Sequence, residues 1–357
     1  MKEIIAKLAK AENLSEEEAV SAMTEIMEDR ATEAQIAAFL MGLRMKGETV
    51  AEITGCAKVM RAKALRIEID KDAIGLDRDD INVDRETIVD TCGTDGDGTN
   101  TFNISTATAF VVAGGGYLVA KHGNRSVSSR CGSADVVRCL GVNIDITPEQ
   151  VRECLHKVGI GFLFAPLYHS AMKFALPVRV QMGIRTIFNL LGPLTNPAGA
   201  NIQVLGVYEA GLTEKIARVL ANLGSRSALV VCGEGSPETS SGQALDEISI
   251  VGKTNISQLK KGKVTNYLVQ PEDFGLPRAD LDDIRGGTAE DNAEIILAVM
   301  KGKQGAPRNI VLMNSAAAFL AAGRVKNWKE GVAYAEEVID SGKALAKIQA
   351  LIEFTNK

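Results

Sequence analysis

Two apolar, β-branched runs in this chain each end in a polar loop that contains glycine and leads into a predicted helix. TIVDTC (87–92) runs into DTCGTDGDGTNTFNIST, which spans Asp90–Thr106, and YLVAKH (117–122) runs into KHGNR at Lys121–Arg125. Apolar strands separated by helical segments are typical of a mostly parallel sheet covered by helices. The two loops are therefore predicted to follow neighbouring strands and to form one site.

The same alternation continues after these loops, whereas the start of the chain has a different rhythm. IQVLGVY (202–208) and SALVVCG (227–233) are further strand-like runs, and the tail from Thr288 onward has helical spacing. Before Thr87, apolar residues recur at helical spacing through the first sixty or so residues. We therefore expect a small N-terminal helical domain and a larger α/β domain with a mostly parallel central sheet.

Capping signals and a charged segment set the expected boundaries. Ser15 with Glu18 and Thr32 with Gln35 are capping boxes that open two helices, and a third helix is expected over 49–64. The charged, weakly periodic stretch that follows indicates a linker or an insertion. The predicted division is a helical domain at 1–66, a linker or insertion at 67–86, and an α/β domain at 87–357.

The first loop has features of an anion-binding loop. Gly93, Gly96 and Gly98 allow positive φ and close approach of the backbone to a ligand. Ser105 and Thr106 fall in the first turn of the next helix, where free N–H groups and the helix dipole favour phosphate. The Rossmann and Walker patterns are both absent from this loop. A tight strand-to-helix turn without a ligand is the alternative interpretation.

Carboxylates occur in two places where they could serve a cation or a sugar. Asp95 and Asp97 lie inside the first loop, where they make sense if a hydroxylated sugar or magnesium binds as well. Asp246 and Glu247 lie in ALDEIS, where paired carboxylates can hold magnesium through oxygen ligands and water. For the second pair, a solvated acidic surface is the more common explanation.

The second loop is rich in cationic and hydroxyl side chains. Lys121 and Arg125 suit phosphate oxygens, and Asn124 offers both a donor and an acceptor. Alone, such a run is more often a solvated loop, but its position after an apolar strand favours a site. Further along, His169 could line a substrate path and Arg179 could bind a carboxylate, but by residue type alone an ordinary packed histidine and a surface ion pair are the favoured explanations.

Composition excludes several classes of protein. The net charge is −5 and aromatic residues make up 4% of the 357 residues, so neither a basic nucleic-acid surface nor an aromatic base-stacking platform is expected. The six cysteines are dispersed and form no CxxC pair, which favours reduced thiols in the cytoplasm. We expect no signal peptide, no membrane span and no partnership with membrane or nucleic acid.

Taken together, the ordered motifs resemble the anthranilate phosphoribosyltransferases nearly from end to end. The resemblance is carried by GTDGDGTNTFNIST, KHGNRSVSS, RCGSAD, GIRTIFNLLGPLTNP, ALDEIS and GGTAEDNAEIILAVMKG. It implies transfer of the phosphoribosyl group from phosphoribosyl pyrophosphate to the amine of anthranilate, with release of pyrophosphate, in tryptophan biosynthesis. It also implies Mg²⁺, a homodimer formed through the helical domain, and helices near 165–185 that return to that domain.

The resemblance further implies the site residues, none of which is assigned as a general base. Asn124, His169 and Arg179 would position anthranilate together with Gly93, and Arg179 would face its carboxylate. Ser105, Asp246 and Glu247 would carry magnesium. The phosphoribosyl pyrophosphate pocket would consist of Gly93, Gly96, Asp97, Thr101, Asn103, Ile104, Ser105, Thr106, Lys121, His122, Gly123, Asn124, Arg125, Ser126, Val127, Ser128, Ser129 and Ser133.

The chain departs from the family pattern at a few places, and two other functions stay open at this stage. Asp95 stands where glycine is more common, and Ser170 replaces a proline. The segments 66–86 and SPETSSGQ (236–243) are longer than usual. A pyrimidine nucleoside phosphorylase is the alternative enzyme, but the acidic pair in ALDEIS disfavours it. A non-catalytic nucleic-acid-binding relative is disfavoured by the acidic net charge.

Overall fold

The structure, a computed structural model, describes residues 1–69, 87–94, 98–125, 131–235 and 244–357. Four N-terminal helices come first: α1 (Lys2–Leu8), α2 (Glu16–Met27), α3 (Glu33–Lys46) and α4 (Val50–Lys63). The two predicted capping boxes are confirmed, since Ser15 and Thr32 each accept a hydrogen bond from the backbone three residues on. A third box at Thr49 opens α4. The helix starts are therefore specified locally by sequence.

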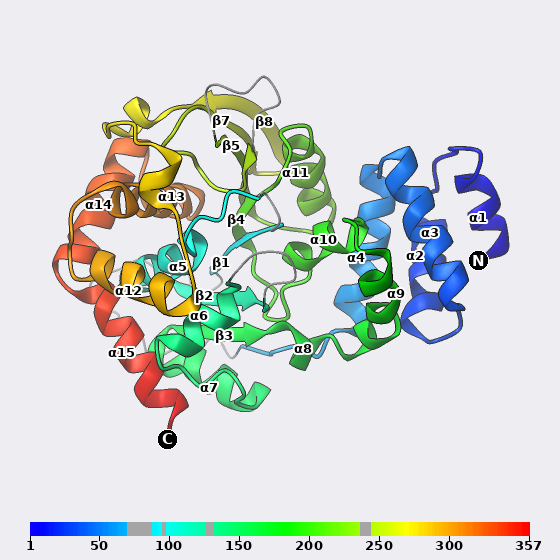
Figure 1. Cartoon of the computed structure of the whole chain (residues 1–357), viewed down its shortest axis with the longest axis horizontal. Coiled ribbons are helices and arrows are strands. Elements are labelled where there is room, and N and C mark those ends of the chain that lie inside the picture. The colour runs from blue at the N-terminus through cyan, green and yellow to red at the C-terminus, as the bar shows by residue number, and fades with distance from the viewer. Residues whose placement is uncertain (70–86, 95–97, 126–130, 236–243) are drawn as a thin grey trace.

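A twisted mixed sheet forms the centre of the remaining chain (Figure 1). Its strand order is β3-β2-β1-β4-β5-β7-β8, with β6 paired to β5. Strands β1 to β5 are parallel, whereas β6, β7 and β8 are antiparallel. The strands are β1 (Ile88–Gly93), β2 (Leu118–Gly123), β3 (Ile160–Phe164), β4 (Ile202–Gly206), β5 (Ser227–Glu234), β6 (Ala244–Leu245), β7 (Thr254–Lys260) and β8 (Lys263–Val269).

The predicted mostly parallel sheet is confirmed, and the structure adds an antiparallel hairpin at one edge that the sequence analysis missed. Strands β7 and β8 are joined by Lys261 and Gly262, which have φ of 51° and 74°. A two-residue turn with positive φ at both positions matches the twist of a hairpin. In the sequence, the Lys261–Gly262 pair between two segments of alternating residues could have indicated this hairpin.

Alternation along the strands divides the core between the two faces of the sheet. Leu229 and Val231 belong to a cluster that includes α5 (Ile104–Gly114) and α13 (Ala306–Ala321). Val230 and Cys232 face the opposite cluster, which also holds apolar residues of the N-terminal helices. Both faces are therefore buried, as expected for a parallel sheet.

The N-terminal helices pack with segments that lie far along the chain. Helix α3 contacts α9 (Leu176–Met182), α4 contacts α10 (Ile187–Leu191), and α2 contacts η1 (Ser170–Phe174). Figure 1 shows α9 beside the blue N-terminal helices and α10 between these helices and the sheet. The segment after β3 thus connects the sheet to the helical bundle, beginning with α8 (Ala165–Tyr168).

Of the remaining helices, α11 (Leu212–Asn222) and η2 (Gly192–Leu194) pack on the face of the sheet that also holds the N-terminal helices, and the others cover the opposite face and the flank beside β3. The helical spacing predicted from Thr288 onward is confirmed, and near its end Gly342, with φ of 76°, separates α14 (Trp328–Asp340) from α15 (Lys343–Thr355). The other elements are α6 (Ser133–Cys139), α7 (Pro148–Val158), η3 (Pro271–Phe274), η4 (Leu281–Ile284) and α12 (Ala289–Met300).

Two further features bear on the sequence-based expectations. All six cysteines are free thiols, and only Cys139 is exposed. In the described ranges, none of the helices combines the length and the apolar character needed to cross a bilayer.

Candidate active site

The junction of β1 and β4 brings together a predicted ligand-binding glycine and a predicted metal ligand. Gly93 and Gly206 are register partners at the carboxyl ends of these strands. A Cβ on Gly93 would lie 2.4 Å from Oδ2 of Asp246, and one on Gly206 would lie 1.5 Å from the Asp246 backbone oxygen. Both positions must therefore be glycine for Asp246 to sit on the sheet edge.

The segment after Asp246 is held by a side chain that the sequence analysis missed. Asn314 of α13 accepts the backbone N–H of Ile248 at 3.0 Å and donates to the Ile248 carbonyl at 3.2 Å. Its amide also donates to the carbonyl of Ile310 at 2.9 Å. Asn314 is 1% exposed, so this clamp is shielded from water and fixes the chain beside Asp246 and Glu247.

Lys121 and Ser105, both predicted ligand-binding residues, meet at the end of β1. The Lys121 ammonium donates to the Thr91 carbonyl at 2.5 Å and to Ser105 Oγ at 3.3 Å. Thr91 Oγ1 in turn donates to the Ser105 carbonyl at 2.8 Å. An ammonium has three donors, and Lys121 uses two of them on described residues, so the third is available to a ligand or to a residue outside the described ranges.

The N-terminus of α5 is available to an anion because its N-cap residue bonds elsewhere. Asn103 makes no side-chain cap. Its Oδ1 accepts from Asn292 Nδ2 at 3.0 Å, and its amide donates to the Cys131 carbonyl at 3.4 Å. The N–H groups at the start of α5, including those of Ser105 and Thr106, therefore donate no hydrogen bond to the N-cap side chain, which suits phosphate.

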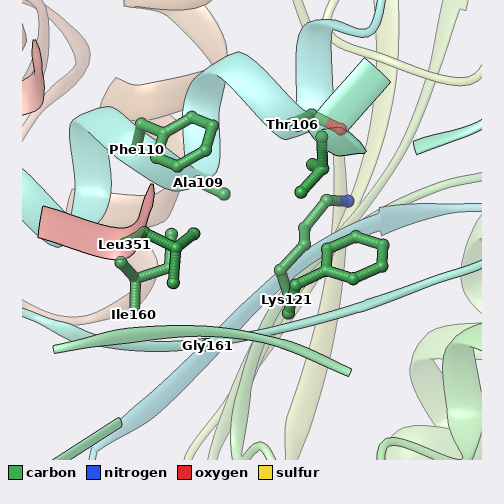
Figure 2. A pocket seen from close by; sticks show the side chains of 9 residues that line it. Thr106, Ala109, Phe110, Lys121, Ile160, Gly161 and Leu351 are labelled. Carbon is green, nitrogen blue, oxygen red and sulfur yellow. The ribbon is translucent and has the colours of Figure 1, made fainter. Parts of the chain in front are cut away.

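A small apolar pocket behind Lys121 accounts for the direction of its side chain (Figure 2). Phe110, Ile160 and Leu351 line it together with Lys121 and Thr106. The hydrocarbon stem of Lys121 lies along this lining, and its ammonium is directed toward the Thr106 end of α5 (Figure 2). Lys121 is 4% exposed, so its ammonium points toward the start of α5 and not into solvent.

The end of β2 brings together a second set of predicted residues. Asn124 accepts hydrogen bonds through its backbone carbonyl from Ser133 Oγ at 3.3 Å and from the Ala134 N–H at 3.1 Å. A Cβ on Gly123 would lie 2.2 Å from Ser133 Oγ, so this strand end also requires glycine. The Arg125 guanidinium lies 5.8 Å from the centre of the Phe164 ring.

His122 and His169 form a buried pair that no sequence pattern had indicated. Their Nε2 atoms are 3.3 Å apart, and their ring centres are 5.1 Å apart. Burial is the main cause that lowers the pKa of His122 to about 3 and the pKa of His169 to about 4. At neutral pH both rings are therefore uncharged, and one must donate while the other accepts.

Arg179 lies on α9, on the segment that connects the sheet to the helical bundle. Its guanidinium stacks over the Phe188 ring at 5.2 Å, and burial lowers its pKa. Within the described ranges, no carboxylate forms an ion pair with this group. A partly buried guanidinium without a carboxylate partner is suited to binding an acidic ligand.

The remaining predicted residues are either placed nearby or lie outside the described ranges. Thr101 forms an isolated β-bridge with Arg285, and Ile104 begins α5. The predicted residues outside the described ranges are Gly96, Asp97, Ser126, Val127, Ser128 and Ser129, together with the departures at Asp95, most of 66–86 and 236–243.

The residues present fit a magnesium ion that is shared with a ligand. The Asp246 carboxylate lies on the strand edge beside Gly93, where the predicted phosphate loop begins. Across the described part of the chain, no group of three His, Cys, Asp or Glu side chains could enclose a metal. Mg²⁺ is commonly bound by one or two carboxylates plus substrate phosphates and water, and this donor set matches that pattern.

A helical bundle joined to an α/β domain, with cationic loops and carboxylates at the strand ends, defines a class of transferases. The helical bundle domain of the glycosyl transferase family matches residues 2–64, and the a/b domain of that family matches residues 85–345. The predicted fold class is confirmed by these matches and by the sheet.

Similar curated proteins and solved structures identify one family within this class. Anthranilate phosphoribosyltransferase from Geotalea uraniireducens is 53% identical over 357 residues, which is 100% of both chains. The structure of this enzyme from Thermus thermophilus has a TM-score of 0.88 at 38% identity and 99% coverage of both chains. That from Saccharomyces cerevisiae, in complex with PRPP and Mg, has a TM-score of 0.84 at 27% identity and covers 99% of this chain and 97% of its own. The chain belongs to the anthranilate phosphoribosyltransferase family.

Proposed function

We propose that this chain transfers the 5-phosphoribosyl group from phosphoribosyl pyrophosphate to the amine of anthranilate, giving N-(5-phosphoribosyl)anthranilate and pyrophosphate. The observation that carries the proposal is similarity to enzymes of that name over the entire chain. The arrangement of Lys121, Ser105, Gly93 and Asp246 at adjoining strand ends supports it.

The reaction needs charge stabilisation more than a strong base. The amine nitrogen forms a bond to C1 of the ribose while the bond from C1 to the pyrophosphate oxygen breaks, and the electron pair leaves with pyrophosphate. An aromatic amine is uncharged near pH 7, so it can attack directly and lose its proton afterwards. Fixed positive groups around the leaving group and correct positioning of both substrates are therefore the main sources of catalysis.

The α5 end of β1 is the proposed place for the phosphoribosyl pyrophosphate. The Lys121 donor that bonds to no described residue and the amide groups at the start of α5 would bind phosphate oxygens. Asn124 and Ser133, which are bonded to each other, would close the pocket from the β2 side. The full set of proposed residues is the one that the family resemblance implies, including those outside the described ranges.

Asp246, Glu247 and Ser105 are the proposed residues for Mg²⁺. When bound, the ion would neutralise charge that develops on the leaving pyrophosphate. Ser105 Oγ accepts one hydrogen bond from Lys121 and keeps a second lone pair for a cation. Asp246 is fixed by the glycine pair beneath it and by the Asn314 clamp two residues further on.

Arg179 is the proposed partner of the anthranilate carboxylate, with His169, Asn124 and Gly93 along the same path. The guanidinium is held by Phe188 and has no carboxylate partner within the described ranges, which favours an acidic ligand. His169 is uncharged at neutral pH, so it would contribute a hydrogen bond rather than a charge.

The test is loss of anthranilate fluorescence after mixing purified protein with anthranilate, phosphoribosyl pyrophosphate and Mg²⁺. We expect the anthranilate fluorescence to fall only when both phosphoribosyl pyrophosphate and Mg²⁺ are present. Fluorescence that stays constant with folded protein, together with cleavage of uridine or thymidine by phosphate, would contradict the proposal in favour of a phosphorylase.

We also propose the domain division 1–66, 67–86 and 87–357, with α8, η1 and α9 returning to the helical domain, and a cytoplasmic location. Packing of α3 on α9 supports the return of this segment to the helical domain. The free, mostly buried thiols support a reducing compartment.

A homodimer formed through the helical domain is the proposed assembly. Met41 and Met45 lie one turn apart on α3, and Leu176 and Val180 lie one turn apart on α9; all four are exposed. Apolar exposure on two helices in contact favours burial against a partner. Light scattering should give a dimer for the wild type and a monomer for M45E/V180E. The exposed control L268E on β8 should stay dimeric, and a monomeric wild type would contradict the assembly.

A further inference from the structure

The pairing between β1 and β2 is much shorter than the pairing of either strand with its other neighbour. The register between them covers only Ile88 with Leu118 and Val89 with Val119. By contrast, β1 pairs with β4 over five residues, and β2 pairs with β3 over five residues. Both strands continue to glycine at their carboxyl ends, so beyond the second pair they run without a register partner on this side.

The Asn196 side chain fills the space where this ladder stops. Its Nδ2 donates to Asp90 Oδ2 on β1 at 2.9 Å and to the Ala120 carbonyl on β2 at 2.8 Å. Its Oδ1 accepts the Ala198 N–H at 2.9 Å. Both amide protons and the amide oxygen are therefore used, so the site suits asparagine and no isosteric apolar residue.

Two further bonds between these strands also come from side chains. Asp90 Oδ1 accepts the His122 N–H at 3.4 Å, and the Lys121 ammonium donates to the Thr91 carbonyl. Asp90 is fully buried and Lys121 is nearly so. Burial raises the pKa of Asp90, while the charge of Lys121 and the bond from Asn196 act in the opposite direction. The carboxylate and the ammonium thus compensate each other in a site shielded from water.

We propose that Asp90 and Asn196 are positioning residues for the Lys121 ammonium. Together they hold the ends of β1 and β2 apart, and Asp90 supplies the countercharge that lets Lys121 stay buried with one donor directed to the pyrophosphate of the substrate. The inference deepens the proposed function and rests on it. Neither residue contacts the reacting atoms, so each acts through Lys121.

The test compares N196A and D90N with S257A, a matched control elsewhere in the fold. Ser257 Oγ donates to Thr213 Oγ1 at 2.9 Å in a buried pair on β7 and α11, so S257A also removes a buried hydrogen bond. D90N keeps one oxygen that can accept from Asn196, and it removes the charge and the acceptor for the His122 N–H. It is a second variant in case N196A misfolds. Melting temperature, KM for each substrate and binding of inorganic pyrophosphate are measured for all variants.

We expect KM for phosphoribosyl pyrophosphate and Kd for pyrophosphate to rise about tenfold in N196A and D90N, as for loss of a charge-assisted hydrogen bond. KM for anthranilate should change less than about twofold, and S257A should lower the melting temperature without raising either pyrophosphate constant. Variants that resemble S257A in all constants would overturn the inference. A wild type that binds pyrophosphate but transfers nothing would contradict only the proposed function, and a wild type that binds no pyrophosphate would overturn this inference.

Discussion

Strand β1 pairs with β4 through backbone register partners up to Gly93, the last residue of β1. With β2 it forms only two register pairs, and beyond these the two strands are connected through side chains. On the β4 side, Gly93 and Gly206 are directly paired, and Asp246 rests on them. On the β2 side, Asn196, Asp90 and the Lys121 ammonium make the connections. The Asp246 carboxylate therefore lies on the β4 side of β1, and the Lys121 ammonium lies on its β2 side.

This difference is consistent with two distinct tasks at one sheet edge. A close backbone contact fixes the proposed metal ligand with little freedom, because no side chain fits between the strands and Asp246. A side-chain bridge leaves room between strand ends for a lysine and for the loops that follow. Variants on the two sides should therefore fail in different ways.

The largest effect is expected from Gly206→Ala on the β4 side. Its Cβ would lie 1.5 Å from the Asp246 backbone oxygen, so the segment that carries Asp246 and Glu247 must move. Displacement of a catalytic group by about 1 Å can cost about 100-fold in rate, and we expect at least that loss in kcat/KM. The measurement is steady-state transfer with saturating magnesium.

Gly211→Ala is the matched control for this change. Its Cβ would meet only the Glu209 carboxylate, at 3.5 Å, which is an ordinary contact. We expect near wild-type activity for the control. Equal activity of both alanine variants would show that the close seat of Asp246 is not needed.

A smaller and more selective effect is expected from Arg179→Ala, which alters neither side of β1. Loss of a charge-assisted hydrogen bond is typically about 1.5–3 kcal/mol, so KM for anthranilate should rise about tenfold or more. KM for phosphoribosyl pyrophosphate should stay unchanged, as should both constants in the exposed control R218A. A parallel rise in both KM values for R179A would remove Arg179 from the carboxylate role.

The last prediction concerns stability at the end of β2 rather than catalysis. The pKa values of His122 and His169, about 3 and about 4, lie below the ordinary value of 6.5, so the unfolded chain binds protons that the folded chain does not. The contribution to stability is full above pH 6.5 and is lost as pH falls toward 4, by about 1.4 kcal/mol per pH unit for each histidine.

Urea unfolding of the wild type and of H122Q/H169Q at pH 7, 6, 5 and 4.5 measures this contribution. The double variant should lose stability more slowly as the pH falls. Parallel stability curves over this range would mean that the pair is not buried in its uncharged form, and the β2 end would then be open to water.

Much of the fold could be predicted because its signals are local. The capping boxes at Ser15 and Thr32 each opened a helix where expected, and the strand-like runs became β1, β2, β4 and β5. The β7–β8 hairpin had a local signal at Lys261–Gly262 that was overlooked.

The buried polar network of the site could not be predicted, because its bonds join residues far apart in sequence. Asn196 and Asp90 are 106 positions apart, and Asn314 lies 66 positions from Ile248. The motifs nominated Lys121, Ser105, Gly93 and Asp246 individually, but not the contacts between them. His122 and His169 were both nominated, for different substrates, and their direct contact depends on how the segment after β3 folds back.

Magnesium-dependent binding of phosphoribosyl pyrophosphate to wild type and D246N, followed by calorimetry, tests the central claim that Asp246 on the Gly93–Gly206 pair brings the metal to the pyrophosphate. The account predicts that Mg²⁺ lowers the Kd of the wild type for phosphoribosyl pyrophosphate. In D246N, the factor by which Mg²⁺ lowers this Kd should be at least about tenfold smaller. D246N that binds as tightly as the wild type at every magnesium concentration would contradict it.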